Sequence, residues 1–207
     1  MPKIYKVDGH EEFEPVIFFK AGVPGGTEQE FGDLVAHGLG AVLVSQDRLK
    51  QTAYADRTRR NRDCKAEVKR TVRDRTIQAL VRDEDVVCDA FFNTPEGRAE
   101  RPIQWAKDTD STVVAFAVEV DVKLARERME RWIDTKTLIA PRHSWGDGGP
   151  LKTIDKLHSE LVLPSEADEL VDIVIPVDGS LGLEAMVQQT LARIADRGIE
   201  TRAQFHG

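Results

Sequence analysis

Cysteine, histidine and long apolar runs are all scarce in this sequence. The two cysteines, Cys64 and Cys88, lack the spacing of metal ligands, and the five histidines are scattered, so no metal site is expected from these residues. The apolar runs, such as residues 113 to 118, are much shorter than the roughly 20 residues of a membrane span, and the first residues lack a signal peptide's apolar segment. We therefore expect a cytoplasmic protein without a membrane segment, in which the cysteines are small buried side chains.

An excess of positive charge is absent from the chain as a whole, but one stretch is strongly basic. The net charge is −7, yet the segment that begins at Arg57 and ends at Arg75 contains nine basic and three acidic residues. Such a segment can bind a phosphate backbone, which predicts a nucleic-acid partner. The alternative is a solvated helix surface with paired charges, for example Glu67 with Lys69 or Arg70, and a protein partner is then equally open.

Short apolar runs alternate with longer stretches of helical periodicity, which is typical of βαβ units and of a parallel sheet covered on both faces. The predicted strands are residues 16 to 20, 41 to 45, 86 to 89, 113 to 120 and 171 to 177. The predicted helices are residues 27 to 37, 62 to 82, 95 to 107, 122 to 132, 151 to 160 and 180 to 196. We expect an α/β fold of about five parallel strands sandwiched by helices. A single domain over residues 15 to 207 would then follow a polar N-terminal arm over residues 1 to 14.

The loop after the first predicted strand has the start of a phosphate-binding loop and then departs from it. The ordinary pattern is G-x-x-x-x-G-K-[ST], in which Lys contacts the outer phosphates and the hydroxyl holds Mg²⁺. Here Thr27 stands where the last Gly belongs, Glu28 where Lys belongs, and Gln29 where Ser or Thr belongs. At ~4 Å and an effective dielectric of ~20, one unit-charge contact is worth ~4 kcal/mol, so the change from Lys to Glu reverses a large interaction. The loop therefore predicts the fold and argues against the ordinary activity. Taken alone, Thr27 and Glu30 also fit the capping box of a following helix.

Three later segments follow the ends of predicted strands, where α/β proteins bind ligands. They read S-Q-D-R-L-K at residues 45 to 50, D-A-F-F-N-T-P-E-G-R at residues 89 to 98, and a helix with Arg126, Arg128 and Arg131. With the loop, and in this order, they resemble the bacteriophage polynucleotide kinase-like group of P-loop kinases over residues 16 to 177. That group has the elements G-x-P-G-S-G-K-S, S-x-D-x-x-R and D-A-T-N-x-x-P-E-x-R, followed by the arginines of a lid.

The resemblance implies site roles for individual residues. Asp47 matches the general base that accepts the proton of a 5′-hydroxyl, and Lys50 falls where the group has an arginine that contacts the substrate or the transferring phosphate. The alternative for Asp47 is the N-cap of the next helix. The residues that would bind the nucleotide are Gly22, Pro24, Gly25, Gly26, Thr27, Glu28, Gln29, Arg128 and Arg131. The residues that would bind the acceptor substrate are Asp89, Asn93 and Arg98.

Some of these positions have a purely structural alternative. Phe91 and Phe92 stand where the group has Thr and Asn, and they either stack on a base or belong to the core. The arginines of the expected lid are alternatively surface residues paired with Glu127 and Glu130.

Two functions are consistent with this pattern. The first is a degenerate polynucleotide kinase-like P-loop protein with weak or no ATP-dependent phosphotransfer, which acts as a nucleic-acid or protein binding module. The second is an active kinase that uses ATP and Mg²⁺ to phosphorylate a hydroxyl of a nucleic acid or nucleotide. Asp47 would then be the base, and Lys20 or Lys50 would replace the missing loop lysine. The degenerate loop favours the first.

Overall fold

The computed structural model describes residues 5–7, 10–12, 14–56, 60–141, 145, 148–199 and 201. Arg57 and Arg59 of the basic segment therefore lie outside the described residues, as does part of the expected N-terminal arm. Within the described part, residues Tyr5–Val7 (β1) and His10–Glu12 (β2) pair as antiparallel strands. No helix among the described residues is long and apolar enough to cross a membrane.

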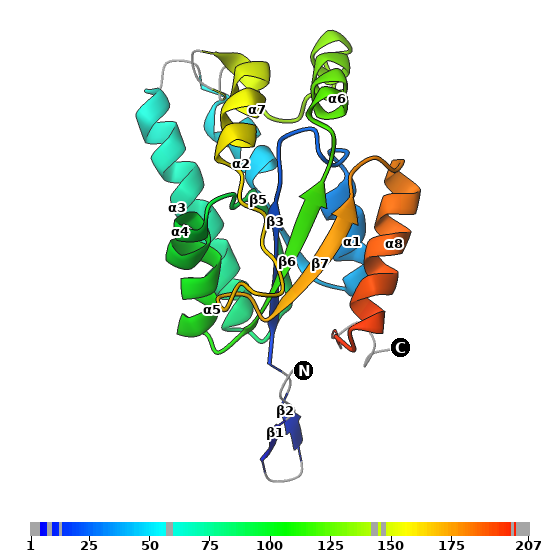
Figure 1. Cartoon of the computed structure of the whole chain (residues 1–207). Coiled ribbons are helices and arrows are strands. Elements are labelled where there is room, and N and C mark those ends of the chain that lie inside the picture. The colour runs from blue at the N-terminus through cyan, green and yellow to red at the C-terminus, as the bar shows by residue number, and fades with distance from the viewer. Residues whose placement is uncertain are drawn as a thin grey trace.

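A five-stranded parallel sheet forms the centre of the fold (Figure 1), as the alternating sequence pattern predicts. Its order is β4 (Val42–Ser45), β5 (Val86–Phe91), β3 (Val16–Ala21), β6 (Thr112–Glu119) and β7 (Ile173–Asp178). The central strand β3 reads V-I-F-F-K-A, and all six residues are buried, because helices cover both faces of the sheet. All five strands run the same way, so their carboxyl ends meet at one edge.

Each face of the sheet packs against its own set of helices. On one face, α1 (Phe31–Leu39) and α8 (Leu183–Asp196) enclose a core around Phe18 and Phe116. On the other face, α3 (Asn61–Leu80) and α5 (Gln104–Asp108) enclose a core around Phe19 and Phe92. The helices α6 (Val122–Asp134) and α7 (Gly149–Glu160) lie beyond the carboxyl ends of the strands, as Figure 1 shows. That edge is therefore roofed, and it is where a site is expected.

Two stretches of helix differ from the sequence prediction. Residues Gln46–Ala53 form α2, which was not predicted and which begins because the Ser45 hydroxyl accepts a hydrogen bond from the Arg48 N–H at 3.5 Å. The predicted helix over residues 95 to 107 consists of α4 (Pro95–Arg98), a π-helical stretch (Ala99–Ile103) and α5. Pro102 lies inside the π-helical stretch. The helix departs from regular α geometry there because proline lacks the N–H that a regular helix needs and its ring displaces the preceding turn.

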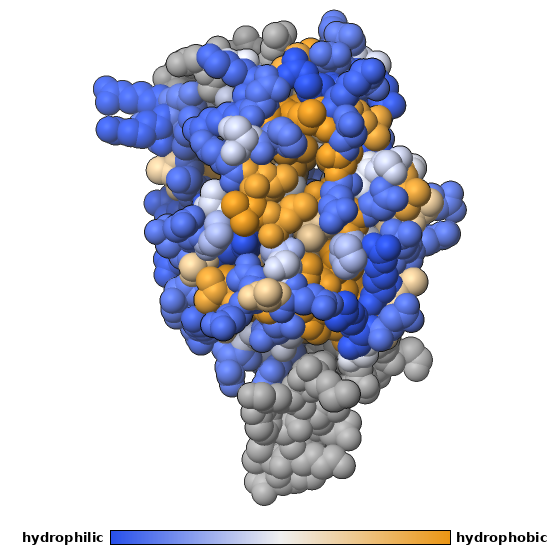
Figure 2. Space-filling model, in the orientation of Figure 1, coloured by the Kyte–Doolittle hydropathy of each residue, from blue (hydrophilic) through white to orange (hydrophobic). Residues whose placement is uncertain are grey.

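Arg98 connects α4 to the chain between α7 and β7. Its side chain is 1% exposed, and its guanidinium donates to the carbonyl oxygens of Val162 at 2.7 Å and Phe92 at 3.4 Å. It also pairs with the Asp168 carboxylate at 3.0 Å. Figure 2 shows apolar side chains gathered in the middle of the same face, which includes this connecting chain, where Val162 is half exposed. Arg98 therefore fastens a segment that buries only part of its own apolar surface.

We predict that Arg98→Leu lowers the free energy of unfolding by about 3 kcal/mol, because it leaves two carbonyls and a carboxylate without their buried partner. Arg75→Leu on the exposed face of α3 is the matched control and should stay within about 0.5 kcal/mol of the parent. Chemical denaturation followed by circular dichroism measures both. Equal stability of the two variants would contradict the structural role of Arg98.

Candidate functional site

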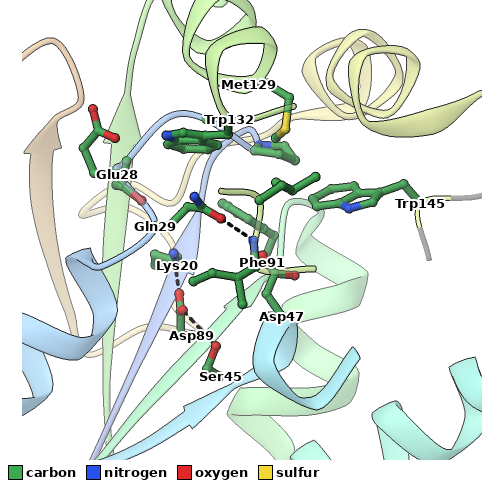
Figure 3. A pocket seen from close by; sticks show the side chains of 15 residues that line it. Lys20, Glu28, Gln29, Ser45, Asp47, Asp89, Phe91, Met129, Trp132 and Trp145 are labelled. Atoms are coloured by element: carbon green, nitrogen blue, oxygen red, sulfur yellow. Dashed lines mark hydrogen bonds and ion pairs between the residues drawn. The ribbon is translucent and has the colours of Figure 1, made fainter. Parts of the chain in front are cut away.

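A small pocket lies at the carboxyl edge of the sheet, under α6 and the chain that follows it (Figure 3). The loop after β3 contributes one wall, the ends of β4 and β5 contribute the floor, and Met129 and Trp132 of α6 contribute the roof. Pro24, Gly25, Thr27, Glu28, Gln29, Asp47 and Asp89 of the predicted site all line it. The cavity volume is about 30 Å³, far below the roughly 300–1,000 Å³ of usual small-molecule sites.

The loop is held closed by direct packing of α6 on its backbone. Gly25 has a φ of +82°, and a Cβ at this position would lie 2.3 Å from the Ala125 carbonyl oxygen of α6. The Gly26 N–H donates to the Val23 carbonyl at 2.9 Å. This N–H therefore closes a turn within the loop and is not free to bind a phosphate.

The helix after the loop begins later than predicted. The prediction of a helix from residue 27 with a Thr27 and Glu30 capping box is wrong, because α1 begins at Phe31 and its N-cap, Glu30, makes no side-chain hydrogen bond to the helix. The residue in the lysine position of the loop thus precedes the helix. The N-terminus of α1, which favours anions, therefore lies four residues later in the chain than predicted, directly after Glu30.

Glu28 binds the two arginines that the resemblance assigned to nucleotide binding. Its carboxylate lies 3.3 Å from Arg128 Nε and 3.0 Å from an Arg131 guanidinium nitrogen. The Glu28 side chain is 19% exposed, and that of Arg128 only 7%. A carboxylate of the protein therefore already neutralises the two arginines to which the resemblance assigns a phosphate.

Arg128 is also the most heavily hydrogen-bonded side chain of the site. Its guanidinium donates to the carbonyl oxygens of Gly25 at 3.3 Å, Gly26 at 3.2 Å, Gly179 at 2.6 Å and Leu181 at 3.1 Å. Burial lowers the pKa of Arg128, and the nearby Glu28 carboxylate opposes that change. The interpretation of Arg128 as a surface arginine is wrong.

The other two arginines of α6 are surface residues, although not with the expected partners. Arg126 pairs with Asp155 of α7 at 2.5 Å, and Arg131 pairs with Glu28. Neither partner is Glu127 or Glu130, because the two arginines face α7 and the loop. The ion pairs of all three arginines thus join α6 to its neighbours.

Gln29 is equally committed to the protein. Its side-chain amide donates to the Thr137 carbonyl at 3.0 Å, and its oxygen accepts from the Ile139 N–H at 2.7 Å. The residue in the place of the Mg²⁺-binding hydroxyl therefore fastens the chain after α6 over the pocket, as Figure 3 shows for the side chain.

On the floor of the pocket, Lys20 and Asp89 form a nearly buried ion pair. Their side chains are 8% and 11% exposed, and the Asp89 carboxylate also accepts from the Ser45 hydroxyl at 3.4 Å. The Lys20 ammonium lies 4.9 Å from the centroid of the Phe91 ring. Beside them, burial raises the pKa of Asp33, with Arg48 opposing and Asp89 adding to the shift. In ordinary phosphate-binding proteins, an aspartate at the end of a neighbouring strand helps to hold Mg²⁺. Here the carboxylate in that place, Asp89, is paired with Lys20.

Asp47 and Lys50 form a second ion pair at the mouth of the pocket. Their atoms are 2.9 Å apart, and the Lys50 ammonium lies 4.4 Å from the centroid of the Trp145 ring. The interpretation of Asp47 as a helix N-cap is wrong, since Ser45 has that role. Asp47 is therefore available to the site, although its carboxylate is partnered.

A second, larger pocket of about 350 Å³ adjoins the first and shares Pro24, Phe91 and Trp145 with it. Asn93 lines this pocket and accepts a hydrogen bond from the Gly22 N–H at 3.0 Å, so the two predicted residues meet. The sequence did not predict Arg101 or Trp145, which also line it. A tryptophan within a glycine-rich polar connection was the one available signal.

The remaining predicted residues are placed as follows. Phe92 belongs to the core, in edge-to-face contact with Phe19 and Trp105, while Phe91 lines both pockets. Arg98 lines neither pocket, and its buried guanidinium instead contacts Val162 and Asp168.

The residues of the first pocket do not fit Mg²⁺-ATP bound as in an ordinary phosphate-binding loop. The lysine and the hydroxyl are replaced by Glu28 and Gln29, both of which already bind protein groups, and Asp89 is paired with Lys20. Among the described residues, no group of three or more histidine, cysteine, aspartate or glutamate side chains could hold a metal ion.

Comparisons of sequence find no relative, because no family model and no curated protein matches the chain. Comparisons of structure find kinases. A candidate kinase from Chloroflexus aurantiacus J-10-fl has a TM-score of 0.63 at 17% identity over 84% of this chain and 96% of that one. A gluconokinase from Sinorhizobium meliloti 1021 has a TM-score of 0.54 at 16% identity over 89% and 93% of the two chains. A fungal RNA kinase has a TM-score of 0.55 at 14% identity over 88% and 85%. At these identities the likeness shows the fold, and this chain has the α/β fold of P-loop kinases.

We predict that Gly25→Ala lowers the free energy of unfolding by about 2 kcal/mol or more, since it adds a Cβ at positive φ against the backbone of α6. Gly182→Ala is the matched control, because no atom lies within 4 Å of its added Cβ, and it should change stability by less than about 0.5 kcal/mol. Thermal unfolding of the two variants measures the difference. If Gly25→Ala were as stable as the control, α6 would not rest on the loop.

Proposed function

We propose that this chain is a polynucleotide kinase-like P-loop protein with a degenerate loop. Its phosphate-donor site is filled by its own side chains, it has weak or no ATP-dependent phosphotransfer, and it acts as a nucleic-acid binding module. The observation that carries the first part is the Glu28 carboxylate bound by Arg128 and Arg131. We take residues 15 to 207 as one domain that carries this function and residues 1 to 14 as its arm.

Opening the donor site would cost several favourable interactions at once. A triphosphate in the loop would meet the Glu28 carboxylate, and one such repulsion at ~4 Å is worth ~4 kcal/mol at an effective dielectric of ~20. Glu28 would also have to leave both arginines. Arg128 cannot follow the phosphate easily, because four carbonyl oxygens hold its guanidinium in place. The closed pocket is therefore the stable arrangement of these residues.

The alternative function is an active kinase, favoured by the presence of Lys20 and Asp47 in the lining of the same pocket. In that case Lys20 would replace the loop lysine and Asp47 would accept the proton of the attacking hydroxyl. Both charges are already paired, Lys20 with Asp89 and Asp47 with Lys50, so two ion pairs must open first. The fold shared with an RNA kinase makes an oligonucleotide hydroxyl the acceptor to test.

Nucleic acid would bind along the outer surface of α3. Lys65, Lys69 and Arg73 are exposed and lie one helical turn apart, while Val68 and Val72 of the same helix are buried. Asp74 opposes this charge weakly, because Arg73 approaches it only at 4.0 Å on an exposed surface. α3 runs along the left side of the view in Figure 1. The result is a straight row of cations that fits the spacing of successive phosphates rather than a single anion.

Calorimetric titration tests the donor site. We predict no ATP binding by the parent at millimolar concentration, with or without Mg²⁺, whereas Glu28→Lys with Gln29→Ser should raise ATP affinity at least tenfold, because a cation then faces the phosphates. Glu130→Lys, which makes the same charge change on the exposed face of α6, should leave the parent's behaviour unchanged. Micromolar ATP binding by the parent would contradict the proposal. A kinase assay on 5′-hydroxyl oligonucleotides with Asp47→Asn would then decide for the active enzyme.

Fluorescence anisotropy with a labelled DNA duplex tests the α3 surface. Replacing Lys65, Lys69 and Arg73 together by Gln should weaken binding and reduce the slope of log K against log salt by about 2 to 3, because about 0.9 counterion is released per phosphate contact. The matched control replaces Lys107, Lys123 and Lys156, which are exposed on three other helices, by Gln. Equal losses in the two triple variants would show a general charge effect and would favour a protein partner instead.

A further inference from the structure

Two residues in the lining of the larger pocket each have a buried donor that no group among the described residues satisfies. Asn93 is 7% exposed, and while its oxygen accepts from the Gly22 N–H, its amide nitrogen Nδ2 has no acceptor among the described residues. The indole nitrogen Nε1 of Trp145 is likewise buried without a partner in that part of the chain. A buried donor left unpaired costs about 1–3 kcal/mol, so two of them in one pocket lining indicate that something else supplies the acceptors.

The charged groups of the same pocket define the acceptor further. Lys50 and Arg101 both line it. The Arg101 guanidinium lies 5.2 Å from the centroid of the Phe92 ring, and it makes no ion pair with a carboxylate of the described residues. Lys50 is already paired with Asp47, which leaves Arg101 as the cation with spare charge. An oxyanion is the group that such an unpaired guanidinium binds best.

The rest of the lining fits hydroxyl groups and a small apolar surface. Glu160 offers a carboxylate to a hydroxyl hydrogen, and the Thr94 hydroxyl, which accepts from the Gly97 N–H, still has its own hydrogen to donate. Phe91 and Trp145 add apolar ring surface to the wall. A cavity of about 350 Å³ is near the lower end of the usual range for small-molecule sites.

We propose that this second pocket binds a small polyhydroxylated anion, a sugar acid or a sugar phosphate. Its oxyanion pairs with Arg101, its oxygens accept from Asn93 Nδ2 and Trp145 Nε1, and a hydroxyl donates to Glu160. Its carbon skeleton lies against Phe91 and Trp145. This site goes beyond the proposed nucleic-acid function and needs no ATP, because none of its contacts involves the first pocket's Glu28 or the cations of α3.

Calorimetric titration without nucleotide tests the site with three probes. D-glucuronate carries a carboxylate, ribose 5-phosphate carries a phosphate, and glucose is the neutral reference. At least one anion should bind ten times or more tighter than glucose, and which of the two does so distinguishes a sugar acid from a sugar phosphate. Neither anion binding better than glucose would overturn the proposal and leave ordered water as the partner of the two donors.

Variants assign the binding to this pocket. Arg101→Gln should weaken binding of the better anion at least tenfold, and Trp145→Phe, which keeps an aromatic ring and removes the N–H donor, should weaken it severalfold. Lys107→Gln on α5 is the control, since it makes the same charge change at an exposed position, and it should bind as the parent does. Circular dichroism confirms that each variant is folded. Unchanged binding by both pocket variants would place the anion elsewhere and overturn the proposal, while the ATP and DNA titrations would still stand.

Discussion

The guanidinium of Arg128 joins three parts of the chain that are far apart in sequence. It donates to two carbonyls of the loop after β3 and to two carbonyls of the chain between β7 and α8, and it belongs to α6. A buried cation needs a nearby anion, and Glu28 supplies it. The closed loop, the roof made by α6 and the small volume of the first pocket all depend on this one charged group, since each requires that α6 rest on the glycines.

The two pockets differ in how far their polar side chains are already paired within the protein. In the first pocket, the side chains in the lysine and hydroxyl positions of the loop are bound by other residues of the chain, Glu28 by Arg128 and Arg131 and Gln29 by the backbone of residues 137 to 139. In the lining of the second pocket, Asn93, Trp145 and Arg101 keep unused hydrogen-bonding or charge capacity among the described residues. A protein under selection only for stability would be expected to satisfy the polar groups of both. The contrast therefore supports the proposed binding role of the second pocket.

Much of the fold could be predicted from the sequence, but the closed state of the site could not. The strands are short apolar runs because the sheet is buried on both faces, and this local property of residues such as Val16 and Phe116 is visible in a single chain. Glu28 meets Arg128 and Arg131 about a hundred residues away along the chain, and no local pattern encodes that meeting. Arg128 lies in a run of alternating charges that is typical of a surface, and only its carbonyl acceptors in other loops make it a buried residue. Arg98 shows the same limit, since a motif position expected to bind substrate instead meets Asp168 from a distant connection.

Asn93 links the lining of the second pocket to the loop after β3, since its oxygen accepts from the N–H of the loop's first glycine while its amide nitrogen has no partner among the described residues. A ligand that orients this amide also fixes the oxygen that accepts from the Gly22 N–H. Ligand binding in the second pocket and the conformation of the loop therefore both depend on the Asn93 side chain. Linkage then requires reciprocity: if filling the second pocket strengthens closure of the loop by some factor, closing the loop strengthens ligand binding by the same factor. Through Asn93, a small molecule in the second pocket would therefore bias the conformation of the loop that forms the first.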